Sequence, residues 1–108
     1  MIYNINSAED PQTTIIFNKI SNYPNPFNPS TTISFSINTE SIENTELVVY
    51  NLRGQRVKKL INEQLPSGSY SAIWNRTDEQ DKSVSSGLYF YKMKAGKFVS
   101  VKKMILMK

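Results

Sequence analysis

Three prolines within a ten-residue run constrain the fold of this chain more than any other feature. The run is Tyr23-Pro24-Asn25-Pro26-Phe27-Asn28-Pro29-Ser30-Thr31-Thr32. Each proline ring fixes φ and removes a backbone donor, so the run predicts an extended, rigid segment with Phe27 as its one large apolar anchor. Apolar and polar residues then alternate over residues 31–37, as in a strand that is buried on one face. This order predicts the opening edge of a small β domain.

Further strand-like segments follow along the chain, and turn signals separate them. They are residues 46–51, 56–61, 69–75, 88–94 and 98–107. Residues 46–51 are apolar on both faces, which predicts a central or covered strand. The adjacent Lys58 and Lys59 break the alternation of 56–61 and predict a β-bulge there. In the last segment the side chains of Val99, Val101, Ile105 and Met107 alternate on one face, which Lys103 interrupts.

Polar and glycine-containing stretches separate these segments. Gly54 is expected to take a positive φ in a turn at residues 52–55, and Ala95-Gly96 is expected to form a tight hairpin. Residues 38–45, 63–67 and 76–86 read as connections.

No window shows a useful 3.6-residue apolar period, so the sequence predicts an all-β protein. We predict an immunoglobulin-like antiparallel β-sandwich of about seven strands formed by residues 23–108. Residues 1–22 are polar and are expected to form an approach segment or linker, in which Ile15-Ile16-Phe17 adds an edge strand or packs loosely.

The 108-residue chain contains neither cysteine nor histidine. It therefore lacks the commonest general base, thiolate nucleophiles and the commonest transition-metal ligands. We accordingly predict no catalytic residues, no cofactor and no metal site. Oxygen ligands for Ca²⁺ could come from Asn75, Asp78, Glu79 and Asp81, but their spacing matches no EF-hand, so a solvated acidic loop is the favoured interpretation.

The net charge is +4, and no acidic residue follows Asp81. The late lysines could meet an anionic partner, or they could protect an edge strand against aggregation, which is the interpretation we favour. No stretch approaches the roughly 20 apolar residues that a membrane span needs. No signal peptide is recognisable at the start of the sequence.

Several motifs, taken in order, resemble the type A C-terminal sorting domain of the type IX (Por) secretion system. The resemblance begins with the proline run and continues through Val48-Val49-Tyr50-Asn51-Leu52-Arg53-Gly54-Gln55-Arg56-Val57, then Leu65-Pro66-Ser67-Gly68 with Trp74, then Ser86-Gly87-Leu88-Tyr89-Phe90-Tyr91, and finally Gly96-Lys97-Phe98 with Lys102-Lys103-Met104-Ile105. The immunoglobulin-like domain of flagellar hook-capping proteins has a similar opening. The resemblance covers about residues 22–108.

This resemblance implies a non-catalytic sorting domain at the end of a larger cargo protein. An outer-membrane translocon would read it after transit through the periplasm, and a sortase-like peptidase would cut upstream of Tyr23, leaving the cargo at the cell surface or secreted. No nucleic acid partner is implied. One departure concerns the loop after Trp74, where the family often carries two glycines and this chain has Arg76 and Asp81 or Lys82.

Ten residues are candidates for recognition by the sorting machinery: Pro24, Pro26, Phe27, Pro29, Gly87, Leu88, Tyr89, Gly96, Lys102 and Lys103. For each we keep a structural alternative, in which prolines and Phe27 seal the sandwich, Gly87 starts a strand and the lysines mark an edge. Two other functions stay open: an assembly domain of the hook-capping type, and a carbohydrate-binding module whose platform would be Trp74, Tyr89 and Tyr91. Their spacing favours the core for these aromatics. An open edge strand could also form a dimer.

Overall fold

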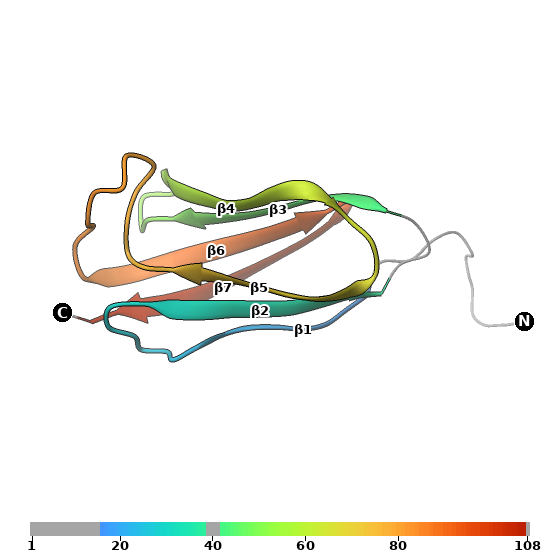
Figure 1. Cartoon of the computed structure of the whole chain (residues 1–108). Helices are drawn as coiled ribbons and strands as arrows, with labels where there is room; N and C mark the ends of the chain where they lie inside the picture. The colour runs from blue at the N-terminus through green and yellow to red at the C-terminus, as the bar shows by residue number, and fades with distance from the viewer. Residues whose placement is uncertain (1–15, 39–41, 108) are drawn as a thin grey trace, which may run out of the picture.

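The computed structural model describes residues 16–38 and 42–107, and every regular element in these ranges is a β-strand (Figure 1). The strands are β1 (Ile16–Tyr23), β2 (Thr31–Asn38), β3 (Glu43–Tyr50), β4 (Arg56–Leu65), β5 (Gly68–Trp74), β6 (Gly87–Ala95) and β7 (Phe98–Leu106). The predicted all-β fold is confirmed.

The strands form two antiparallel sheets that face each other across one core (Figure 1). One sheet has the order β1-β2-β5 and the other the order β4-β3-β6-β7. This is a seven-stranded sandwich of the immunoglobulin-like kind. β3 lies between β4 and β6, which confirms the central position predicted from its two apolar faces.

Two polar stretches that were predicted as connections are strand. β3 begins at Glu43 rather than Glu46, and β4 continues to Leu65 rather than ending at Ile61. The added residues pair with one another, since Glu43 lies opposite Leu65 and the intervening partners continue in register. Pairing satisfies backbone hydrogen-bonding groups whatever the side chains are. The polar side chains were therefore a poor guide to where these two strands begin and end.

The bulge predicted from the adjacent lysines of β4 is confirmed. The register between β3 and β4 shifts twice, between Leu47 and Val48 and again between Val49 and Tyr50. Lys58 and Lys59 lie opposite Val49 and Val48, between these two shifts. β1 also pairs with β2 and has a register shift between Phe17 and Ile20; the strand runs across the boundary expected between residues 22 and 23.

The core takes alternate residues from the inner faces of both sheets. Members include Ile33 and Phe35 of β2, Leu47 of β3, Tyr91 of β6 and Met104 of β7. In β7 the core-facing residues are Met104 and Leu106, so the alternating apolar row predicted for this strand lies on the outside. Its members are between 45% and 55% exposed: Val99, Val101, Ile105 and Met107.

The prediction of an extended proline segment is wrong. The backbone bends at residues 24–26 and again at residues 28–29. Between the bends, Phe27 forms a parallel bridge with Leu106 of β7 and is 2% exposed. Phe27 thus pairs with the last strand between two bends while its ring lies in the core.

Candidate recognition site at one end of the sandwich

Three motifs that are distant in the sequence meet at one end of the sandwich, which we call the motif end (Figure 1). It consists of the proline loop (residues 24–29), the β3–β4 turn (residues 51–55) and the start of β6 with the residues before it (residues 85–89). The sheets bring these segments together because β2, β4 and β6 all begin here.

Asn51 builds the β3–β4 turn. Its Oδ1 accepts hydrogen bonds from the amides of Arg53 (2.9 Å) and Gln55 (3.0 Å), and the amide of Gly54 donates to its carbonyl oxygen at 2.9 Å. Gly54 has a φ of +83°, which confirms the predicted positive φ. With its polar groups used inside the turn, the segment presents Leu52 to solvent at 68% exposure.

The start of β6 is fixed by a tyrosine. The hydroxyl of Tyr89 donates to the carbonyl oxygen of Ser85, four residues upstream, at 2.6 Å. A tyrosine near the start of this strand that bonds back to the preceding loop is the tyrosine corner of immunoglobulin-like sandwiches. Gly87, between them, has a φ of +145°, a conformation that a side chain disfavours, and a Cβ there would meet no heavy atom within 4 Å.

A shallow pocket of about 260 Å³ separates the turn from the start of β6. Its lining includes Leu52 and Arg53 from the turn and Ser86, Gly87 and Leu88 from the other side. It therefore combines one exposed and one partly exposed leucine, one guanidinium group and open backbone. Leu52 and Arg53 were not among the site residues predicted from the sequence, although a leucine at the tip of an Asn-to-Gly turn is an exposed apolar residue and could have marked the place.

An aromatic chain beneath this surface links the proline loop to the start of β6 through Trp74, at the end of β5. The ring of Phe27 lies 5.7 Å from that of Trp74, which lies 5.1 Å from that of Tyr89. The indole nitrogen of Trp74 donates to the carbonyl oxygen of Thr77 at 2.9 Å. Trp74, Tyr89 and Tyr91 are 0%, 6% and 1% exposed, so the prediction that they belong to the core is confirmed, and they form no exposed sugar-stacking platform.

The proline loop is anchored to the last strand by three hydrogen bonds. Phe27 donates its amide to Ile105 O at 3.0 Å and accepts from the amide of Met107 at 2.8 Å. The side chain of Asn25 accepts from the amide of Ile105 at 3.0 Å. Pro24 and Pro26 are exposed, whereas the bond from the Thr31 hydroxyl to Pro24 O (2.8 Å) is partly buried.

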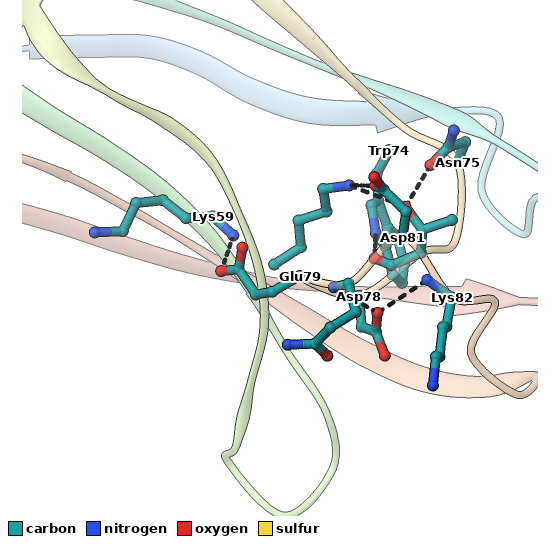
Figure 2. Close-up of polar contacts among 10 residues, drawn as sticks. Lys59, Trp74, Asn75, Asp78, Glu79, Asp81 and Lys82 are labelled. Atoms are coloured by element: carbon teal, nitrogen blue, oxygen red, sulfur yellow. Dashed lines mark hydrogen bonds and ion pairs between the residues drawn. The ribbon is translucent and has the colours of Figure 1, made fainter.

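The acidic loop after Trp74 is held against β4 by its own carboxylates (Figure 2). Glu79 accepts from the amide of Lys59 at 3.0 Å, and Asp81 accepts from the amine of Lys58 at 2.9 Å. Asp78 accepts from the amides of Gln80 and Lys82, and the hydrogen bond from Lys82 is the main reason why the pKa of its carboxyl group is lowered.

These contacts direct the carboxylates toward internal donors. Within residues 16–38 and 42–107, no group of three or more His, Cys, Asp and Glu side chains could hold a metal ion. Arg76 and Asp81 have φ angles of +57° and +61°. Arg76, at one position where the family often has glycine, thus keeps a left-handed backbone without it, and so does Asp81, one of the two candidates for the second position.

The remaining candidate residues lie away from the motif end. Gly96 is in the β6–β7 hairpin at the opposite end, where its amide donates to Asn44 O at 3.2 Å. Lys102 and Lys103 lie in the length of β7, opposite Tyr91 and Phe90, and neighbouring strand residues point to opposite faces. The structure therefore brings seven of the ten candidates together: Pro24, Pro26, Phe27, Pro29, Gly87, Leu88 and Tyr89.

A comparison with protein-family models decides the family. The model described as secretion system C-terminal sorting domain matches residues 21–107. The chain belongs to this family. The match confirms the type IX resemblance drawn from the motifs, and domains of this family act as sorting signals in proteins that reach the outer membrane, the cell surface or the medium.

A solved structure has a similar fold. The crystal structure of dimeric latent PorU from Porphyromonas gingivalis matches with a TM-score of 0.66 and 19% identity. The match covers 91% of this chain and 10% of the PorU chain, and at this identity it shows the fold alone. The search of curated proteins found no match. Among the described residues of the domain, no helix could cross a membrane.

Proposed function

We propose that this domain is a non-catalytic sorting signal that directs a cargo protein, attached on its N-terminal side, through the outer membrane. Its partners are the outer-membrane translocon and a sortase-like peptidase that cuts upstream of Tyr23, after transit through the periplasm. The observation that carries this proposal is the match of residues 21–107 to the sorting-domain family. The motif end supplies the surface, because most of the motifs that define the resemblance converge there.

The candidate residues divide into two roles in this proposal. Phe27 and Tyr89 are buried, so they hold the motif end in shape rather than touch the machinery. The exposed or partly exposed groups that contact the machinery are Leu52, Arg53, Gly87 and Leu88 around the pocket, with the exposed Pro24, Pro26 and Pro29 nearby. A pocket with apolar walls and one cation fits a partner loop that carries an apolar side chain next to a carboxylate.

Export of a reporter fused before the domain tests this proposal. Leu52→Lys should reduce the amount of reporter that reaches the cell surface several-fold, because the pocket loses an apolar wall. Ile73→Lys is the matched control, since Ile73 is 67% exposed, close to the 68% of Leu52, but lies on β5 outside the pocket. Purified variants should show unchanged circular dichroism, so that folding is not the cause.

Export of both variants at the wild-type level would show that the pocket is not read. If Leu52→Lys and Ile73→Lys both reduce export while both variants remain folded, recognition would be assigned to a wider surface. An assembly role of the hook-capping type predicts instead that the isolated domain forms polymers, which sedimentation would detect.

A further inference from the structure

The outer edge of β7 is divided into an occupied and an open part. Beside Ile105 and Met107 it is occupied, because Phe27 and Asn25 take up the backbone groups that point away from β6. Backbone direction alternates along a strand, so the amides and carbonyls of Val99, Val101 and Lys103 point to the same outer side. Within the described part of the chain, no hydrogen bond occupies them.

The open part is regular, unlike two other edges of the sandwich. β7 pairs with β6 in unbroken register from Phe98 to Leu106. β4 carries two register shifts, and Glu79 caps the amide of Lys59 on its edge. β1 also has a register shift. Shifts and caps are devices that prevent strand addition, and the middle of β7 has neither.

The charge around this edge selects what can bind. Lys102 and Lys103 project from opposite faces of β7, and Lys94 and Lys97 lie nearby on β6 and in the hairpin. Within residues 16–38 and 42–107, no carboxylate pairs with any of these four amines. Val99 and Val101, 49% and 55% exposed, add β-branched side chains next to Lys103 on the outer face.

We propose that residues 99–103 of β7 bind an extended acidic segment of a partner protein as an added strand. Backbone hydrogen bonds to Val99, Val101 and Lys103 supply the general attraction, and carboxylates beside Lys102 and Lys103 supply the selectivity. The lysines also oppose addition of a second copy of β7, because they would bring two basic strands together. This site is distinct from the motif end, and its test does not depend on export.

The probe is a short, capped, fluorescent peptide in which glutamate and valine alternate, with fluorescence anisotropy as the readout. Wild-type domain should bind it saturably. Val101→Pro should weaken binding about tenfold or more, because proline removes an outward amide but leaves the charge and the pairing with β6 intact. Lys103→Glu should weaken it by a similar factor, whereas Lys82→Glu, the same charge change in the acidic loop, should leave it nearly unchanged.

Equal affinity of wild type and Val101→Pro would overturn the proposal, because binding would then depend on charge alone. Binding of vesicles containing an anionic phospholipid, unaffected by Val101→Pro and stronger than peptide binding, would also overturn it and assign the face to a lipid surface. Amide hydrogen exchange on the wild-type domain tests the same proposal without a variant, and so it remains decisive if Val101→Pro does not fold. Added peptide should slow exchange at Val99, Val101 and Lys103, and no slowing at these three amides would overturn strand addition.

Discussion

The hydroxyl of Tyr89 ends 2.6 Å from the carbonyl oxygen of Ser85, while its ring packs against Trp74 inside the sandwich. The bond fixes the last residues of the loop before β6 and, with them, one wall of the recognition pocket. Tyr70 makes a bond of the same length to Pro66, also four residues upstream, in the β4–β5 connection. The two tyrosines therefore make the same hydrogen bond at sites of different burial.

Tyr89→Phe should lower the free energy of unfolding by about 1 kcal/mol, because it removes the partly buried hydrogen bond from the Tyr89 hydroxyl to the Ser85 carbonyl oxygen. Tyr70→Phe should cost less, since Tyr70 is more exposed and water can replace its hydroxyl. Urea denaturation of both variants measures the difference. A larger loss for Tyr70→Phe would contradict the assignment of Tyr89 as the corner residue.

Burial raises the pKa of the Tyr91 hydroxyl to about 12. Its hydroxyl donates to the side chain of Asn22 at 3.3 Å, which links β6 to β1 across the core. Because an exposed tyrosine ionises near pH 10, the contribution of Tyr91 to stability is complete below that pH and is lost as the pH rises toward 12.

At the scale of elements, the loop after Trp74 behaves as a cover for the β4 edge. Glu79 caps an edge amide, and Arg56 adds an ion pair to the same carboxylate at 3.6 Å. Glu79→Ala should therefore speed hydrogen exchange at the amide of Lys59 and lower the free energy of unfolding by about 0.5–1 kcal/mol.

Glu79→Gln is the matched variant, because its amide oxygen can still accept from Lys59 while the charge is gone. It should keep most of the protection at this amide. If the amide of Lys59 exchanges equally fast in Glu79→Gln and in Glu79→Ala, charge rather than the capping hydrogen bond holds the loop in place.

Period-two alternation was sufficient to predict β2 and β6, because each has an alternating row of large apolar residues that lies in the core. It was not sufficient for β7, where both faces carry apolar residues and only the packing of Met104 and Leu106 decides which one is inside. The polar ends of β3 and β4 were missed for a related reason. Their strand conformation comes from pairing with each other, and no local pattern encodes a partner about twenty residues away.

The candidate site was predictable in its parts but not in its assembly. The motif around Gly87 and the turn at Gly54 are both visible in the sequence, yet only the strand order makes them neighbours. Arg76 shows the opposite case, since it stands where the family often has glycine and no local signal in the sequence predicts a left-handed backbone. The left-handed backbone is kept there, and the carbonyl of Arg76 accepts from the amide of Val84 at 2.9 Å.

At the scale of the whole molecule, Phe27 joins both sheets at the motif end. It bridges to β7 of one sheet and its ring packs on Trp74, at the end of β5 in the other. Phe27→Ala should lower the free energy of unfolding by about 3–5 kcal/mol through the cavity it leaves. It should also shift the fluorescence of the single tryptophan, Trp74, to longer wavelength.

Tyr23→Ala is the control, because this neighbouring aromatic side chain is 82% exposed. Its effect on the free energy of unfolding should stay within about 0.5 kcal/mol. A comparable loss in both variants would mean that the proline loop stabilises the domain through its backbone rather than through the buried ring.

The bond between Asn25 and Ile105 connects positions that are 80 residues apart. Such distant partners meet only after most of the intervening chain has been ordered, and this slows folding. A molecule caught before that meeting would leave Trp74 without its cover and one wall of the core open to water. Resistance to proteases should therefore arise in a single late step. The time at which the proline loop joins β7 then sets how long a newly made molecule stays open to proteolysis.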